Sequence, residues 1–133
     1  MIPKFRAWDK RQNVMRDVAV LHFTKSGKVN FIEYWKTPSE LKSYHVRNIE
    51  LMQSTGLKDK NGVESWEGNY LVKDGYWPFF IKWIESEGLL MAVPVNSIQR
   101  TNWKPVSVKG LLDTGYINDG NIYENPELLE EQR

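Results

Sequence analysis

Glycine-containing turns divide the 133-residue chain into short apolar runs, and this spacing is the feature that most constrains its fold. The runs are rich in β-branched and aromatic residues, which favour strands. Asn61-Gly62 is the strongest turn signal, because this pair between apolar runs is typical of a tight hairpin. The spacing therefore predicts a mainly β protein with only short helical turns.

The first part of the chain, residues 1–48, is predicted to be a β-hairpin region followed by a connector. In the apolar run that follows Gly27, the side chains of Val29, Phe31 and Trp35 share one face, so we expect that face to cover a core. The expected strands are residues 4–8, 18–23 and 28–35, with a hairpin at Gly27 between the last two.

The connector, residues 36–48, contains a helix-start signal. Thr37 suits the N-cap position, Pro38 suits the first helical position, and Glu40 suits the third position of a capping box. We expect a short helix or turn to begin here.

A series of short strands is predicted for residues 49–112, and strands at this spacing suggest a small barrel or sandwich. Residues 113–133 are expected to add a strand and a helical turn, with Asn125 as the N-cap and Pro126 in the first turn. The expected strands of the middle segment are residues 49–54, 63–73, 76–86, 89–95 and about 105–112.

Composition excludes several classes of protein. The chain has no cysteine, which excludes a disulfide framework, a thiol nucleophile and a thiolate metal site. It has no apolar run of the ~18 residues that a membrane span needs, and its first residues do not resemble a signal peptide. A hydrophobic content of 41% is enough for a packed core. We expect a cytoplasmic protein with no membrane partner.

Charge is unevenly distributed, although the formal net charge is only +1. Residues 1–50 hold ten Lys/Arg against five Asp/Glu, whereas residues 111–133 hold one against six. Such asymmetry indicates either an interaction tail or two segments that neutralise each other when the chain folds.

Catalytic, metal-binding and phosphate-binding motifs are not found in the sequence. His22 and His45 have no Ser or acid motif nearby, and a Gly-x-Ser-x-Gly elbow and Gly-rich phosphate loops are absent. The acidic residues near the C-terminus do not have the spacing of a calcium loop. We therefore predict a protein that is not an enzyme and that has no cofactor and no metal site.

Aromatic residues are concentrated between positions 66 and 83, with Lys73, Lys82 and Arg100 as the nearest cations. Three interpretations stay open: core filling, contact with another subunit, and stacking of nucleic-acid bases. Too many consecutive residues are apolar for all of them to point inward. The candidate interaction surface is Tyr76, Trp77, Phe79 and Phe80; the wider cluster adds Trp66, Tyr70 and Trp83.

Three segments together resemble the YopX family of bacteriophage and prophage proteins. The first is Ile2-Pro3-Lys4-Phe5-Arg6-Ala7-Trp8-Asp9. The second runs from Met52 to Gly62 and on to Glu67-Gly68, and the third runs from Gly120 to Leu129. The resemblance implies an SH3-like barrel after an N-terminal β-rich region, and it implies no established activity. Asn69 stands where the family usually has Asp, and Ser65-Trp66 where an Ile-Tyr pair is common.

The central motif also has a physical interpretation of its own. Gly56 and Gly62 can adopt positive φ, so we interpret the motif as a hairpin that fixes strand register, with a binding site as the alternative. We expect Lys58-Asp59-Lys60 to be a solvated tip and Leu57 and Val63 to turn back into the core. The motif residues singled out are Thr55, Gly56, Leu57, Asp59, Asn61, Gly62, Glu67 and Gly68.

The C-terminal motif is predicted to contact a neighbouring subunit, because its apolar residues and the aromatic cluster compete for limited surface. Opposite charges at the two ends of the chain favour such pairing, so we expect a closed homo-oligomer. The motif residues are Gly120, Asn121, Ile122, Tyr123, Asn125, Pro126, Leu128 and Leu129.

The function predicted from the sequence is that of a phage or prophage accessory protein in the host bacterial cytoplasm, acting through non-catalytic contacts with an unknown phage or host protein. The alternative is a weak nucleic-acid-binding module that uses the basic N-terminal half or exposed aromatic residues.

Overall fold

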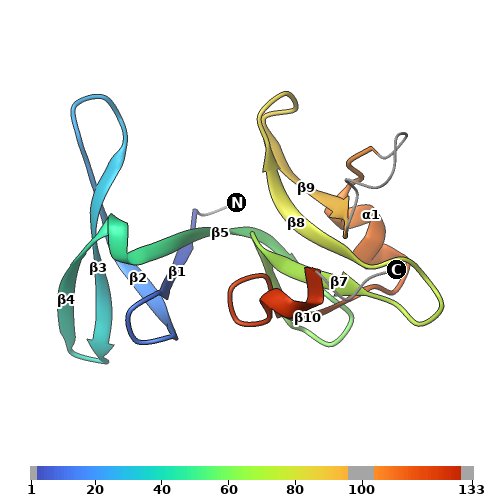
Figure 1. The fold of residues 1–133 in the computed structure, drawn as a ribbon, viewed down its shortest axis with the longest axis horizontal. Helices are drawn as coiled ribbons and strands as arrows, with labels where there is room; N and C mark the ends of the chain where they lie inside the picture. The colour runs from blue at the N-terminus through green and yellow to red at the C-terminus, as the bar shows by residue number, and fades with distance from the viewer. Residues whose placement is uncertain (1–2, 96–103, 130–133) are drawn as a thin grey trace. The chain divides into compact units, whose positions relative to one another are not determined.

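The computed structural model describes residues 3–95 and 104–129, and its chain divides into two compact units. The N-terminal unit is Met1–Gln53 and the C-terminal unit is Ser54–Arg133. The prediction of a mainly β protein is confirmed, since antiparallel sheets dominate both units (Figure 1). The sequence had predicted three segments, 1–48, 49–112 and 113–133.

The N-terminal unit is an antiparallel sheet built from consecutive hairpins (Figure 1). Its strands lie in the order β4-β3-β2-β1-β5, and the first half of β5 pairs with β1. The predicted hairpin at Gly27 is present between β2 and β3. The elements are β1 (Phe5–Asp9), β2 (Val14–Phe23), β3 (Val29–Thr37), β4 (Glu40–His45), the 3₁₀ helix η1 (Val46–Asn48) and β5 (Ile49–Lys58).

The core of the N-terminal unit lies on the face of β3 opposite to the predicted one. Ile32 and Tyr34 are buried, whereas Phe31 is 40% and Trp35 46% exposed. Both faces of β3 carry large apolar side chains, so the alternation alone did not identify the buried face. The buried cluster consists of Ala7, Ile32, Tyr34 and Ile49.

The turn between β1 and β2 is held by the carboxylate of Asp9, which is fully buried. Asp9 Oδ1 accepts hydrogen bonds from the backbone N–H groups of Arg11 and Gln12 and from the Tyr44 hydroxyl. Its Oδ2 accepts from the Arg16 guanidinium at 3.3 Å. A single side chain thus closes the turn and links β1, β2 and β4.

Of the short helix or turn expected from Thr37, the turn is present and the helix is not. Thr37 ends β3 and Glu40 begins β4, so the segment is a tight hairpin turn. The Thr37 hydroxyl stabilises this turn: the Ser39 N–H donates to Thr37 Oγ1 at 3.3 Å, and Thr37 Oγ1 donates to Glu40 Oε1 at 3.5 Å. Ser and Thr stabilise turns by the same local hydrogen bonds that cap helices, which explains the misleading signal.

The C-terminal unit contains the β5–β6 hairpin and a four-stranded antiparallel sheet in the order β10-β7-β8-β9. Its β10 pairs with β7, so the acidic C-terminal segment contributes a strand to this sheet. The elements after β5 are β6 (Glu64–Trp66), β7 (Asn69–Val72), β8 (Phe79–Ile84), β9 (Leu89–Pro94), the helix α1 (Val108–Asp113), β10 (Ile117–Asn121) and the 3₁₀ helix η3 (Pro126–Leu129).

Of the strand predicted for residues about 105–112, only an antiparallel bridge between Val106 and Ala92 of β9 forms, because Val108–Asp113 is the helix α1. Ser107 caps this helix by accepting a hydrogen bond from the Gly110 N–H at 3.0 Å. Val108 and Leu112, four residues apart on one helix face, are both buried. Without this strand the described sheets are not closed, so the SH3-like barrel is not confirmed.

The core of the C-terminal unit lies between the sheet and α1. Leu57 of the central motif and Phe79 pack against its buried residues. Among the described residues, no helix is long and apolar enough to cross a membrane. The buried cluster consists of Leu71, Ile81, Ala92, Val108, Leu112 and Tyr116.

The register of β3 leads to a first prediction. Ile32→Ala should lower the free energy of unfolding by about 2–5 kcal/mol, because it leaves a cavity in the core. Phe31→Ala, one residue away on the exposed face, should cost less than about 1 kcal/mol. Urea unfolding of both variants measures the two costs, and a larger cost for Phe31→Ala would place Phe31 on the buried face instead.

Candidate functional site

The central motif forms the β5–β6 hairpin, and the Asp59 carboxylate organises its turn. Asp59 Oδ1 accepts hydrogen bonds from the Asn61 N–H at 2.9 Å and the Val63 N–H at 3.0 Å. The Gly62 N–H donates to the Asp59 carbonyl at 2.9 Å, and Gly62 has a φ of 80°. A residue with a side chain adopts that conformation only at a cost, which accounts for glycine at this position.

The second carboxylate oxygen of Asp59 joins the hairpin to β10. Asp59 Oδ2 accepts from the backbone N–H of Asn118 at 2.9 Å and from its side-chain amide at 3.1 Å. Asp59 is only 6% exposed, so the prediction of a solvated tip is wrong at this residue. Val63, expected to turn into the core, is instead 48% exposed.

Asn69 extends the same network into β7. Its amide donates to Asn118 Oδ1 at 2.9 Å, while the Asn118 amide also donates to the Val63 carbonyl at 3.1 Å. A carboxylate at position 69 has no such donor. The amide at position 69 therefore fits its partner Asn118, whose side-chain oxygen accepts from it.

Hydrogen bonds keep the Asp59 carboxyl group ionised although it is buried. Burial by itself raises the pKa of a carboxyl group, but the donors on Asn118, Val63 and Asn61 stabilise the charged form and lower the pKa of Asp59 below 3.8. The same balance of burial against hydrogen bonds from Gln12 and Arg11 lowers the pKa of Asp9. Both carboxylates are therefore ionised at neutral pH.

The end of the central motif packs directly against the C-terminal motif. The Ile122 N–H donates to the Gly68 carbonyl at 2.9 Å, and the Gly68 N–H donates to the Ile81 carbonyl at 2.7 Å. Gly68 has a φ of 90°, and a Cβ atom there would lie 3.3 Å from Tyr123 Cε2. Glycine at position 68 thus permits both the backbone conformation and the close approach of the Tyr123 ring.

The C-terminal motif folds around the buried side chain of Asn121. Asn121 Oδ1 accepts from the N–H groups of Tyr123 at 3.0 Å and Glu124 at 2.8 Å. Asn125 precedes η3 as predicted, but its side-chain oxygen accepts from the Asn121 N–H at 3.3 Å. The Tyr70 hydroxyl donates to the Asn125 carbonyl at 3.1 Å, which fixes this turn on β7.

The two motifs line one surface depression of about 300 Å³, which we term the motif depression. Trp83, at its edge, is 44% exposed. The sequence did not predict that residues some fifty positions apart line the same depression. It is lined by Glu67, Gly68, Phe80, Ile81, Lys82, Trp83, Ile122 and Tyr123.

The other aromatic residues of the predicted interaction surface have different environments. The Trp77 indole donates to the Val95 carbonyl at 3.0 Å, and Phe79 contacts Tyr116 edge to face. Tyr76 is 62% exposed, and its ring lies 4.4 Å from the Lys73 ammonium. Only part of the run therefore faces solvent, and Phe80 is the member that reaches the motif depression.

The two histidines that were considered for chemistry both lie beside Phe31, on the strands that flank β3, and the His22 imidazole lies 2.7 Å from Glu33 Oε2. His22 and His45 lie on strands of the N-terminal unit, and Arg100 lies outside the described residues. In residues 3–95 and 104–129, no three His, Asp or Glu side chains gather to hold a metal ion. Asn118 is the residue that the sequence analysis missed. Asp59, two residues before Asn61, matched the pattern of a side chain that closes its own turn, whereas no local pattern marks Asn118.

Comparison with known proteins identifies the family. Residues 4–130 match the family described as YopX protein, so the chain belongs to the YopX family and the predicted membership is confirmed. A similar solved structure is that of protein EF1440 from Enterococcus faecalis, which is 30% identical in sequence. The similarity covers 97% of this chain and 99% of that chain, with a TM-score of 0.66. No protein of curated function matches the chain.

The Asp59 network predicts a stability that depends on pH. Asp59→Asn should lower the free energy of unfolding by about 1–3 kcal/mol at pH 7, because the new amide NH2 group would face N–H groups that can only donate. The pKa of Asp59 is lower in the folded chain than in the unfolded chain, so its contribution is complete above about pH 5 and declines as the pH falls through the folded value.

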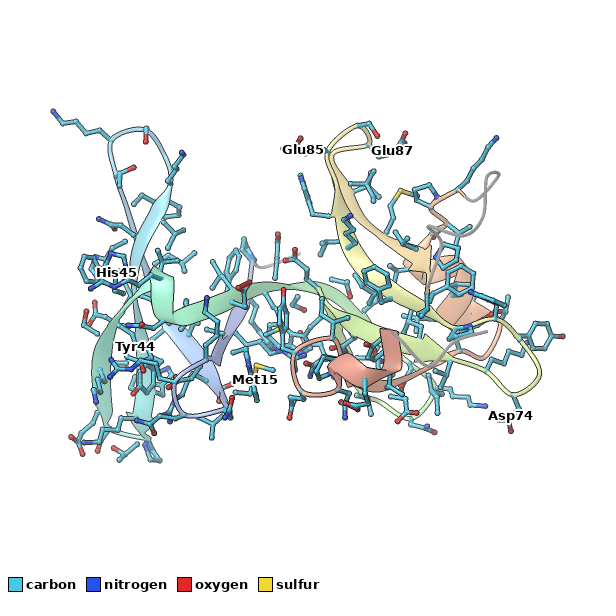
Figure 2. The ribbon with its side chains drawn as sticks, viewed as in Figure 1. Met15, Tyr44, His45, Asp74, Glu85 and Glu87 are labelled. Carbon is cyan, nitrogen blue, oxygen red and sulfur yellow. The ribbon has the colours of Figure 1, made fainter. Side chains whose placement is uncertain are left out.

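Urea unfolding at pH 7, 4 and 3 measures this contribution as the difference between wild type and Asp59→Asn. The difference should shrink toward acid pH. Asp74→Asn, at an exposed turn (Figure 2), is the matched control and should change stability by less than about 0.5 kcal/mol. A difference that is constant with pH would contradict the ionised, hydrogen-bonded state of Asp59.

Proposed function

We propose that the chain is an accessory protein of a phage or prophage that acts by binding other proteins and not by catalysis. Membership in the YopX family supports the phage setting and the host bacterial cytoplasm as its location. The observation that carries the proposal is the motif depression. Its lining combines aromatic and apolar side chains with the charged Glu67 and Lys82, and both family motifs contribute to it.

The use of the motifs' polar groups supports a binding role. Asp59 and Asn118 bond to each other and to neighbouring backbone groups, and Asn121 closes its own turn. These groups stabilise the surface instead of presenting reactive atoms to a substrate. What the motifs offer to a partner is a depression that combines aromatic, apolar and charged side chains, as protein interfaces do.

The partner that we propose first is a second copy of the chain, in a closed homo-oligomer. Residues 1–50 carry a charge of +5 and residues 111–133 a charge of −5, so contact between copies can bring opposite charges together. Because β10 is part of the sheet, the contact is assigned to the motif depression and not to a detached tail. An unknown phage or host protein is the second partner proposed.

This proposal predicts an oligomer in solution that depends on the motif depression. Trp83→Asp introduces a charge at the edge of the depression and should shift the protein toward monomer. Val63→Asp is the matched control, since Val63 is similarly exposed at 48% and does not line the depression. Light scattering at micromolar concentration measures the mass, and circular dichroism checks that each variant is folded.

Wild type and Val63→Asp should have the same mass, above that of one chain. A wild-type protein that stays monomeric at every concentration would contradict self-association. An oligomer that Trp83→Asp leaves intact would contradict the assignment of the contact to the motif depression.

A further inference from the structure

The sheet of the N-terminal unit has an exposed face that none of the motif contacts uses. Strand register places His22 opposite Phe31, and Phe31 opposite His45. Opposite residues of an antiparallel pair share a face, so three rings lie in a row across three strands. The outer face, as we term it, consists of Val20, His22, Phe31, Glu33, Trp35, Leu41, Ser43 and His45.

The rings of the outer face are accessible. Tyr44 and His45 are consecutive residues of β4 (Figure 2), so their side chains point to opposite faces. The Tyr44 ring contacts Tyr34 of the core, whereas the His45 ring contacts Phe31 at 4.9 Å. Phe31 is 40% and Trp35 46% exposed. These two residues are four positions apart on one strand, so roughly 13 Å separates them.

A depression of about 420 Å³ lies at one end of the outer face, beside the row of rings. Its size is in the range of small-molecule and cofactor pockets. It is lined by His22, Phe23, Asn30, Phe31 and Ser43.

Cations border one end of the outer face. Lys25 and Lys28 belong to the β2–β3 turn, next to the row of rings, and Arg47 follows His45 by two residues. Lys36 and Lys42 alternate with outer-face residues, and strand register places Lys42 opposite the buried Tyr34, so they belong to the other face of the sheet. Lys25, Lys28 and Arg47 make no ion pair among the described residues.

Two of the five carboxylates in residues 1–50 pair with cations, Asp9 with Arg16 and Glu50 with Lys10. Glu33, on the outer face itself, lies 2.7 Å from the His22 imidazole. Residues 1–50 keep a net charge of +5, and three of their cations lie beside the row of rings, so an anionic partner is favoured there. A second copy would bring the same positive charge to this face, which disfavours face-to-face pairing of two chains.

We propose that the outer face binds single-stranded nucleic acid, with bases stacked on Phe31 and Trp35 and phosphates attracted by the bordering lysines. Sheets that present exposed aromatic rings bind two or three bases in this way. A duplex keeps its bases stacked inside, so only its phosphates can reach such a face. The rings and lysines that it uses do not line the motif depression, so substitutions can test the two proposals separately.

Fluorescence anisotropy of labelled single-stranded oligodeoxynucleotides, with the duplex of the same sequence, tests the proposal on the full chain. Single strands should bind at about 50 mM salt more tightly than duplex, and binding should weaken steeply by about 200 mM. Phe31→Ala and Trp35→Ala should each weaken binding by about tenfold. Tyr76→Ala, which removes an aromatic ring that is 62% exposed in the other unit and does not line the motif depression, should leave affinity within about twofold.

One further variant separates stacking from simple attraction by charge. The double substitution Lys25→Ser, Lys28→Ser should lower the affinity and make it depend less on salt. Thermal unfolding then checks that the Phe31 and Trp35 variants are folded before their affinities are compared.

Several results would overturn the proposal. These are the absence of binding at low salt, equal affinity for duplex, and affinity that Phe31→Ala and Trp35→Ala leave unchanged. A loss of oligomer mass in the folded Phe31→Ala variant would assign the outer face to a second copy instead.

Discussion

The buried carboxylate of Asp59 is the group on which the arrangement of the two family motifs depends. Its oxygens accept four hydrogen bonds, two from its own turn and two from Asn118 on β10. A buried charge is costly unless such donors surround it. Because the donors come from two segments, the hairpin turn and β10 must come together for either to be fully hydrogen-bonded. Gly68 and Ile122 then bring the remaining parts of the motifs into contact.

The N-terminal unit uses the same device at Asp9, where a strand ends and a turn begins. Asp9 closes its turn with the N–H groups of Arg11 and Gln12 and reaches other strands through Arg16 and Tyr44. In each unit a carboxylate thus satisfies backbone donors inside the fold. The surfaces on which function is proposed are instead built around exposed aromatic rings: Trp83 at the motif depression in one unit, and Phe31 and Trp35 on the outer face in the other.

Much of the β-structure could be predicted from the sequence, because hairpin turns and β-branched runs are local signals. The buried face of β3 could not, since Phe31 and Trp35 on one face and Ile32 and Tyr34 on the other are equally apolar. The segment 105–112 was ambiguous for a similar reason: Val108 and Leu112 fit a helix face, and its other apolar residues fit a strand. The partnership of Asp59 with Asn118 spans 59 residues and depends on strand pairing, so no local pattern reveals it.

The measurement that tests this account most directly is a double-mutant cycle between Asp59 and Asn118, built from Asp59→Ala, Asn118→Ala and the double variant. If the carboxylate joins the hairpin to β10 through Asn118, the free energies of unfolding should deviate from additivity by at least about 1 kcal/mol. Additivity within about 0.5 kcal/mol would contradict the account, because it would mean that the two motifs are stabilised independently.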